Sequence, residues 1–345
     1  MTDEQWEILQ RIINGEIIDP VPVGFIIDCP WLPNWYGKQI IDYFSNDRIF
    51  IDANLKAINN FPDVIFLPGF WSEFGMCTEP SAFGARCRFP SNEFPHAFKI
   101  INTVDDIDGL HQPNPRTDGL LPFMINRLKL AQPEIEAAGH KIKFSVSRGP
   151  LNIASYLMGT TELLTEMMMQ PDKIHLLIRK ITRFLGEWHD LQRETFPTID
   201  GIFLLDDIIG FLGEPEFREF GLPYFKELFG PDHSVKFLHN DAPCRVSAPL
   251  LPEMGINLFN MGFDVHLNEL KELTDNKVAM LGNIPPREVL AEGTSEAVVK
   301  AANDLLDSLE DKSRIIMSCG GGMPPDVSSE NIQAFIDTVR SHKKE

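Results

Sequence analysis

The sequence predicts an α/β protein built as a (β/α)8 barrel, with a helical extension before the first strand. Short apolar runs rich in β-branched residues alternate with longer amphipathic stretches, and about eight such runs occur along the chain. Alternating strands and helices indicate a parallel sheet, and eight repeats favour a closed barrel over an open sheet. The length of 345 residues fits one barrel with insertions, so residues 1–345 are expected to form a single domain.

The expected elements follow one another in a regular order. The expected strands span residues 21–27, 63–67, 142–147, 201–205, 235–238, 255–260, 277–281 and 314–318. Helical periodicity is visible in residues 161–194, 214–229, 267–274, 295–309 and 329–343. Residues 1–20 are expected to form a capping helix. Residues 68–122, rich in Gly, Pro and Phe, form a long insertion after the second strand, and such an insertion usually covers a site.

Composition excludes several classes of partner. A net charge of −19 argues against nucleic acid, whose binding needs clustered Lys and Arg. The first residues are acidic and lack the apolar segment of a signal peptide, and no stretch resembles a membrane span, so the cytoplasm is the expected compartment. Five widely spaced cysteines without a CxxC pair argue against a disulfide framework or a zinc ribbon.

Polar side chains follow many of the expected strands. The active site of a (β/α)8 barrel lies at the carboxyl ends of its strands, so these residues are candidates for chemistry although they are scattered in the sequence. The candidates for substrate binding are Asp28, Arg148, Asp207, Asn260, Asn283 and Met323. Phenylalanines near the expected rim (Phe66, Phe70, Phe74, Phe83 and Phe263) predict an apolar mouth suited to an aromatic or macrocyclic ligand.

His239 and Cys319 follow the fifth and eighth expected strands and form a candidate metal site. Imidazole and thiolate ligands suit Zn²⁺, which keeps one position open in catalytic sites. The third ligand would be Cys244 or Asp241, with Glu79 or Cys77 possible from the insertion. Burial of the cysteine and a proton-transfer role for the histidine are the alternative interpretations.

The pair Asp206-Asp207 ends the fourth expected strand. Alternation along the strand predicts that Asp206 points inward and acts as a catalytic acid or base, while the other carboxylate caps the following segment. Glu79 is the second candidate acid. The glycine-rich turn of residues 319–326 lacks a nucleotide-binding pattern and indicates a close approach of the backbone to a substrate or a neighbouring loop.

Three segments resemble the uroporphyrinogen decarboxylase superfamily. Residues 147–159 (SRGPLNIASYLMG) are similar to its G-x-P-x-x-x-A-x-Y segment, and residues 282–286 (GNIPP) to its GN-[LI]-x-P element. Residues 318–331 resemble its C-terminal G-x-G-x-x-P block, and Asp206 falls where the family has a strand-four Asp. The N-terminal part departs from the decarboxylases: residues 21–31 lack the arginines that would bind porphyrinogen carboxylates.

The cobamide-dependent methyltransferase branch of the superfamily is the nearer resemblance. Its members bind Zn²⁺ through a strand-five His, a nearby Cys and a strand-eight Cys. His239 and Cys319 match the outer positions, whereas Asp241 replaces the middle Cys and Cys244 follows three residues later. Residues 77–84, which include Glu79, resemble the E-x-x-x-x-G element of this branch.

The resemblance implies a zinc-dependent methyltransferase similar to the methyltransferase component of O-demethylases. It would move a methyl group from a small methylated donor, such as an aryl methyl ether, to the Co(I) corrinoid of a partner protein. The chain lacks a D-x-H-x-x-G corrinoid motif, so the cofactor is expected on the partner. The alternatives are a metal-free decarboxylase that uses Asp206, and a non-catalytic barrel that binds a corrinoid protein.

Overall fold

Eight parallel strands form the centre of the molecule in a computed structural model that describes residues 1–342. Six of them pair in the order β10-β9-β8-β7-β6-β5, and β1 pairs with β2. A bridge between Val23 and Met317 joins β1 to the β10 side. The strands are β1 (Gly24–Ile26), β2 (Ile65–Leu67), β5 (Phe144–Arg148), β6 (Gly201–Leu205), β7 (Val235–Asn240), β8 (Leu258–Met261), β9 (Ala279–Ile284) and β10 (Ile315–Cys319).

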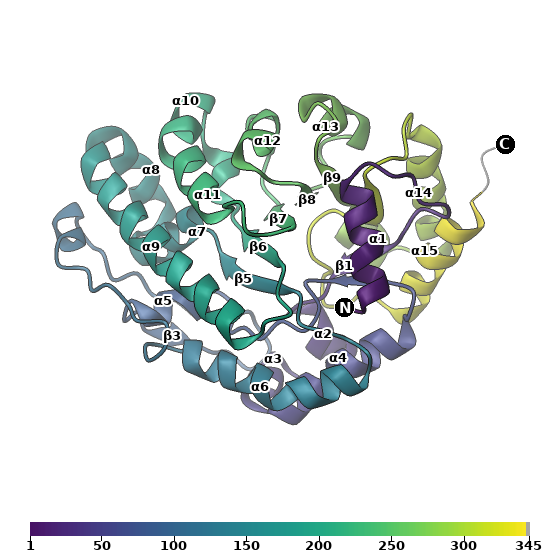
Figure 1. Cartoon of the computed structure of the whole chain (residues 1–345), viewed down its shortest axis with the longest axis horizontal. Helices are drawn as coiled ribbons and strands as arrows, with labels where there is room; N and C mark the ends of the chain where they lie inside the picture. Colours follow the sequence, from purple (N-terminus) through teal and green to yellow (C-terminus); the bar gives the residue numbers. More distant parts are fainter. Residues whose placement is uncertain (343–345) are drawn as a thin grey trace.

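Helices surround these strands, as Figure 1 shows. The longer ones are α1 (Asp3–Ile13), α4 (Asp47–Asn60), α6 (Leu121–Ala137), α7 (Pro150–Met158), α8 (Thr160–Met169), α9 (Pro171–Thr195), α14 (Ser295–Ser308) and α15 (Ser329–Ser341). Shorter ones are α2 (Trp31–Trp35), α3 (Ile40–Ser45), α5 (Thr78–Ala82), α10 (Glu214–Glu216), α11 (Leu222–Leu228), α12 (Leu251–Met254) and α13 (Leu267–Leu273).

The predicted (β/α)8 barrel is confirmed, because each of the eight strands overlaps an expected run. The observed helix boundaries differ from the expected ones at several positions, most clearly in two stretches. The stretch 161–194 divides into α8 and α9 at Gln170, because Pro171 cannot donate a backbone hydrogen bond and therefore begins a new helix. The N-terminal helix spans Asp3–Ile13 rather than residues 1–20, and Thr2 caps it by accepting from the backbone N–H of Gln5.

The apolar residues inside the barrel form a cluster separate from the one between strands and helices. α1 belongs to the inner cluster: Trp6 packs edge-on against Phe144 of β5, with ring centroids 5.3 Å apart. A side chain at Gly201, the first residue of β6, would meet both rings. α1 therefore closes the amino-terminal end of the barrel, and only the carboxyl end of the strands remains for a site.

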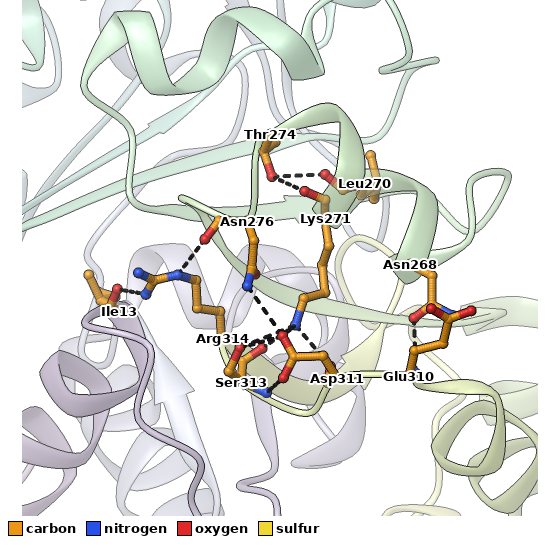
Figure 2. Close-up of polar contacts among 10 residues, drawn as sticks. All are labelled: Ile13, Asn268, Leu270, Lys271, Thr274, Asn276, Glu310, Asp311, Ser313 and Arg314. Atoms are coloured by element: carbon orange, nitrogen blue, oxygen red, sulfur yellow. Dashed lines mark hydrogen bonds and ion pairs between the residues drawn. The ribbon is translucent and has the colours of Figure 1, made fainter.

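Polar contacts hold the elements at the same closed end of the barrel together (Figure 2). Lys271 of α13 is buried and donates to the Asp311 carboxylate at 2.7 Å. Arg314, just before β10, donates through Nε to the Asn276 carbonyl at 2.6 Å and through Nη1 to the carbonyl of Ile13, the last residue of α1. These charge-assisted hydrogen bonds connect the N-terminal helix to the loops that precede β9 and β10.

The insertion after β2 folds over the carboxyl end of the strands. It contains α5, a short antiparallel ribbon of β3 (Cys87–Arg88) and β4 (His96–Ala97), and a single 3₁₀ turn, η1 (Val104–Ile107). Gly75 has φ +56°, and a side chain there would collide with Pro95 of the ribbon's loop. In residues 1–342, no helix has both the length and the apolar character needed to cross a membrane.

His189 of α9 holds the helix to β5, the strand that ends in Arg148. Its Nδ1 lies 2.8 Å from Ser145 Oγ and its Nε2 lies 2.9 Å from Ser147 Oγ. Ser145 Oγ donates to the carbonyl of Gly201, so Nδ1–H donates to Ser145 and Nε2 accepts from Ser147. This arrangement requires a neutral imidazole. Burial, together with the charge of His233, lowers the pKa of His189 to about 3.

A histidine that stays neutral in the folded protein makes stability depend on pH. Below pH 6.5 the unfolded chain takes up a proton at His189, and the folded chain does not until about pH 3. We therefore expect the free energy of unfolding to fall as pH decreases through this window, by up to about 1.4 kcal/mol per pH unit from this residue. Urea unfolding between pH 7 and 5 should show a smaller slope for His189→Gln, whereas the exposed His111→Gln should keep the wild-type slope.

Candidate functional site

A cavity of about 440 Å³ opens at the carboxyl ends of the strands. It is the position at which (β/α)8 barrels place their active sites. Six of the residues selected from the sequence line it: Asp28, Arg148, Asp207, His239, Asp241 and Met323. The other lining residues are Ile26, Cys29, Pro30, Trp71, Met76, Phe94, Asn152, Tyr156, Leu205, Pro286, Arg287, Gly322, Pro324 and Pro325.

Arg148, the last residue of β5, connects the barrel to the segment that follows β2. Its Nη2 donates to Glu73 Oε2 at 2.7 Å, and its backbone N–H donates to Glu79 Oε1 at 3.1 Å. All three side chains are buried. Within residues 1–342 no backbone ladder joins β2 to β5, so these contacts span the one interval between neighbouring strands that lacks a ladder or bridge. The guanidinium also lies over the ring of Trp71, 5.5 Å from its centroid.

Glu79, a predicted catalytic acid, therefore lies behind Arg148 and does not line the cavity. Burial raises the pKa of Glu79 and of Glu73, and the nearby Arg148 charge acts in the opposite direction. In this position Glu79 shapes the wall of the cavity through the backbone of Arg148. Its catalytic role stays a prediction.

Asp28 follows β1 and is the carboxyl group of this cluster that reaches the cavity. Its Oδ1 is buried and has no hydrogen-bond partner among the described residues. Burial and the negative charge of Glu73 raise the pKa of Asp28 well above its usual range. Gly322, after β10, packs beside it, and a side chain at that glycine would come within 3.5 Å of the carboxylate. A protonated Asp28 can donate a hydrogen bond to a ligand in the cavity.

His239 of β7 is oriented by two polar neighbours. Its Nδ1 lies 2.7 Å from Asn260 Oδ1. The Asn260 amide nitrogen donates to the carbonyl of Leu281, so its oxygen is the acceptor and His239 Nδ1 carries a proton. Asp241 Oδ2 lies 3.5 Å from Nε2. Burial lowers the pKa of His239, but the charge of Asp241 outweighs it and raises the value to about 10. Asn260 thus positions His239 and does not line the cavity.

The predicted metal ligands converge only in part. His239 and Asp241 are neighbours, and Cys319 ends β10 at the same end of the barrel. The Cys319 thiol is buried, and burial raises its pKa. It donates a hydrogen bond to the nearby Gly321 carbonyl at 3.6 Å. Cys244 is packed in the outer apolar cluster, where burial raises its pKa to about 12. Among residues 1–342, no group of three or more His, Cys, Asp or Glu side chains is arranged to hold a metal ion.

Asp206 was expected to face the site and Asp207 to cap the following segment, but Asp206 caps α7 and Asp207 lines the cavity; the catalytic role of Asp206 stays a prediction. Asp206 accepts backbone N–H groups of Leu151 and Asn152 at 2.9 and 3.1 Å, which are in the first turn of α7. It is the fully buried cap of that helix, and burial raises its pKa to about 8 against the effect of these donors. Asp207 lines the cavity and accepts the backbone N–H of Asp241. The strand ends at Leu205, so alternation no longer applies at these two positions.

Of the remaining predicted residues, some line the cavity and others are held elsewhere by their own contacts. Met323 lines the cavity. Asn283 instead donates to the carbonyls of Gly262 and Val265, which holds the loop after β8. Of the expected rim phenylalanines, Phe263 is exposed, while Phe66, Phe70, Phe74 and Phe83 are buried in the core and do not line the cavity. An apolar side chain that follows a short strand can be buried in the core or can line the cavity. The sequence alone does not distinguish these two positions.

Several cavity residues were not selected from the sequence, namely Trp71, Met76, Phe94, Asn152, Tyr156 and Arg287. Asn152 and Tyr156 lie on α7, inside the motif that carried the family resemblance, so their place in that motif was an available signal. Trp71, Met76 and Phe94 belong to the insertion. The sequence of this insertion has no helical or strand periodicity, so its course over the barrel could not be predicted.

Comparison with known proteins identifies the family. The family model "Uroporphyrinogen decarboxylase (URO-D)" matches residues 6–342, so the chain belongs to this family. Curated uroporphyrinogen decarboxylases from Hahella chejuensis and Pseudomonas putida are each 24% identical, over 95% of this chain and 94% and 95% of their own lengths.

Solved structures confirm the fold. A methyltransferase from Methanosarcina mazei matches with a TM-score of 0.80 and 17% identity over 96% of each chain. A B12-independent methionine synthase from Shewanella matches with a TM-score of 0.55 and 12% identity, over 93% of this chain and 98% of its own. At these identities the likeness establishes the architecture alone.

Removal of Arg148 should destabilise the protein strongly. Arg148→Met would leave Glu73 buried without its counter-charge, and breaking a buried ion pair in this way costs about 3–5 kcal/mol. The double variant Glu73→Met/Arg148→Met should recover part of that loss, which a double-mutant cycle in urea would measure. Arg245→Met, which breaks an exposed pair with Glu269, is the matched control and should cost less than about 1 kcal/mol. Equal losses for Arg148→Met and Arg245→Met would contradict the interpretation.

Proposed function

We propose that the protein is a methyltransferase that takes the methyl group of a small aryl methyl ether and passes it to the Co(I) corrinoid of a partner protein. The charge of the cavity carries this proposal. Three carboxyl groups line it, those of Asp28, Asp207 and Asp241. Of its two arginines, Arg148 is already paired with Glu73, which leaves Arg287.

This charge distribution is unfavourable for a porphyrinogen. Uroporphyrinogen carries carboxylates around its whole ring, and each would need a cationic partner when it leaves water. Among the described residues of the lining, Arg287 is the guanidinium outside an ion pair, and His239 is already paired with Asp241, so a ring of carboxylates would find too few cationic partners. Although the curated relatives are decarboxylases, the lining residues therefore favour a smaller substrate with little negative charge.

The apolar part of the lining suits an aromatic ring. Trp71, Phe94 and Met323 contribute flat or polarisable surface, and the prolines at positions 286, 324 and 325 add rigid walls. Asp28, His239 and Asp241 form the polar part of the lining. A ring held by the apolar walls would present its ether oxygen to this polar group, which is the orientation that methyl transfer requires.

A reduced corrinoid bound to the partner protein would supply the nucleophile for the methyl group. When the methyl–oxygen bond breaks, the electron pair stays on the ether oxygen, which then needs a proton. Burial and the charge of Glu73 raise the pKa of Asp28, which faces the cavity, so we assign it the role of general acid that delivers the proton to that oxygen. Asn260 and Asp241 hold the ring of His239, whose Nε2–H can donate to the oxygen and orient it. Zinc binding by His239, Cys319 and a third ligand stays a prediction, and no step here depends on it.

Methyl transfer from methoxyaromatic compounds to Co(I) cobalamin tests the proposal. We expect turnover by the wild-type protein and a loss of at least about 100-fold in kcat for Asp28→Asn, because the general acid is removed. Asp264→Asn, an exposed carboxylate paired with Arg245, is the matched control and should keep the wild-type rate. The wild-type protein should not decarboxylate uroporphyrinogen.

The other outcomes separate the alternatives. Decarboxylation of uroporphyrinogen without methyl transfer would favour the decarboxylase and end the proposal. Absence of both reactions, with tight binding of a corrinoid protein, would favour the non-catalytic barrel. Metal analysis of freshly purified wild-type protein and of His239→Ala tests the zinc prediction separately: zinc bound by the wild type and lost from the variant would support it.

A further inference from the structure

The β3–β4 ribbon presents a positively charged face on a strongly acidic molecule. Residues 86–99 contain three lysines and arginines and one glutamate, whereas the whole chain has a net charge of −19. Arg86 and Arg88 point to the same face of the ribbon, because they alternate with Cys87 along the strand. Both arginines are exposed, and among residues 1–342 neither forms an ion pair with another side chain.

Aromatic rings lie on the same face as these arginines. The Arg86 guanidinium lies over the Phe98 ring, 4.3 Å from its centroid, and the His96 ring packs edge-on against Phe98 at 5.4 Å. His96 is the cross-strand neighbour of Arg88. Arginine and aromatic residues are enriched in protein interfaces, and a few of them carry most of the binding energy. We call Arg86, Arg88, His96 and Phe98 the cationic patch.

A surface of the opposite charge follows in the same insertion. Asp105 and Asp108, in and after the η1 turn, are exposed and share one cation, Lys173 at the start of α9, at 3.7 and 2.7 Å. Met168 and Met169, at the end of α8, are the most exposed large apolar side chains of residues 1–342, at 79% and 69%. We call Asp105, Asp108, Met168 and Met169 the acidic patch.

The two patches lie on the same side of the barrel. Lys99, directly after the cationic patch, pairs with Glu162 at the start of α8, and the two charged groups are 2.6 Å apart. The acidic patch begins at the other end of α8. Figure 1 shows β3 and α8 on the left of the molecule. One copy of the chain therefore carries two neighbouring surfaces of opposite charge.

We propose that two copies of the chain associate through these patches around a two-fold axis. The cationic patch of each copy contacts the acidic patch of the other, so the same contacts are made twice, as in an isologous dimer. Guanidinium groups pair well with carboxylates, and methionine sulfur packs favourably against aromatic rings. The proposal does not depend on the reaction that the cavity catalyses.

The charge of the whole molecule favours this arrangement over others. Two copies that each carry a net charge of −19 repel one another unless a cationic surface meets an acidic one. Nucleic acid and anionic membranes are extended polyanions, and the acidic surface around the ribbon would repel them. A second copy instead supplies a compact acidic patch, and its binding covers the exposed methionines.

Association of this kind would also restrain one wall of the cavity. Phe94, in the loop between β3 and β4, lines the cavity, and Gly75 packs against Pro95 of the same loop. A partner that holds the outer face of the ribbon therefore limits the movement of this loop over the cavity.

Charge reversal in each patch, followed by mixing, tests the proposal. We expect the wild type to sediment as a dimer at about 100 µM. Arg86→Glu/Arg88→Glu and Asp105→Lys/Asp108→Lys should each raise the dissociation constant at least about tenfold, because like charges then face each other. An equimolar mixture of these two variants should restore the dimer, since the reversed patches complement one another.

The control reverses two exposed lysines outside both patches. Lys277→Glu/Lys300→Glu changes the net charge as much as the arginine variant does and should leave the dimer intact. A monomeric wild type, a control that dissociates as readily as the patch variants, or a mixture of folded variants that stays monomeric would overturn the proposal.

Hydrogen exchange of the wild type decides the matter if a variant folds poorly. Protection that increases with protein concentration should appear in residues 86–98, 105–108 and 168–169. Protection confined to other segments would contradict the proposed interface. Neither sedimentation nor hydrogen exchange involves methyl transfer, so failure of the dimer and failure of the proposed function are distinguishable.

Discussion

The ion pair between Arg148 and Glu73 is the contact on which the site depends. A parallel barrel is usually held around its circumference by backbone ladders, but here the interval between β2 and β5 has none in residues 1–342. Side chains take over that function: Arg148 contacts Glu73 and Glu79 from the segment after β2, and its guanidinium covers Trp71. The wall of the cavity is formed by the same contacts.

That ion pair also sets the chemistry of its neighbours. Burial raises the pKa values of three carboxyl groups near the guanidinium, those of Asp28, Glu73 and Glu79, and the single positive charge of Arg148 acts against this rise. Asp28 is the member that reaches the cavity, and in our proposal its retained proton is the one that methyl transfer consumes. A positive charge that is already paired is not available for substrate carboxylates, which is why the same arrangement opposes a porphyrinogen.

The insertion after β2 forms much of the cavity wall. It supplies Glu73 and Trp71 to the ion-pair cluster, and Met76 and Phe94 to the cavity. This segment contains only short helices and strands, whereas the helical side of the barrel is held by packed apolar residues.

The sequence by itself determined the architecture, because strand and helix periodicities are local and the eight apolar runs could be located one at a time. It also selected the end of the barrel, and with it Asp28, Arg148, Asp207, His239, Asp241 and Met323, since parallel strands bring their carboxyl ends together. Only the tertiary structure decided which neighbour faces the cavity. Asp206 caps α7, while Asp207 lines the cavity. Asn260 and Asn283 form hydrogen bonds to His239 and to the loop after β8 and do not line the cavity. Cys319 and Cys244 are buried, and within residues 1–342 neither belongs to a group of three or more side chains arranged to hold a metal ion. Those outcomes depend on hydrogen-bond partners distant in the chain, and periodicity contains no information about them.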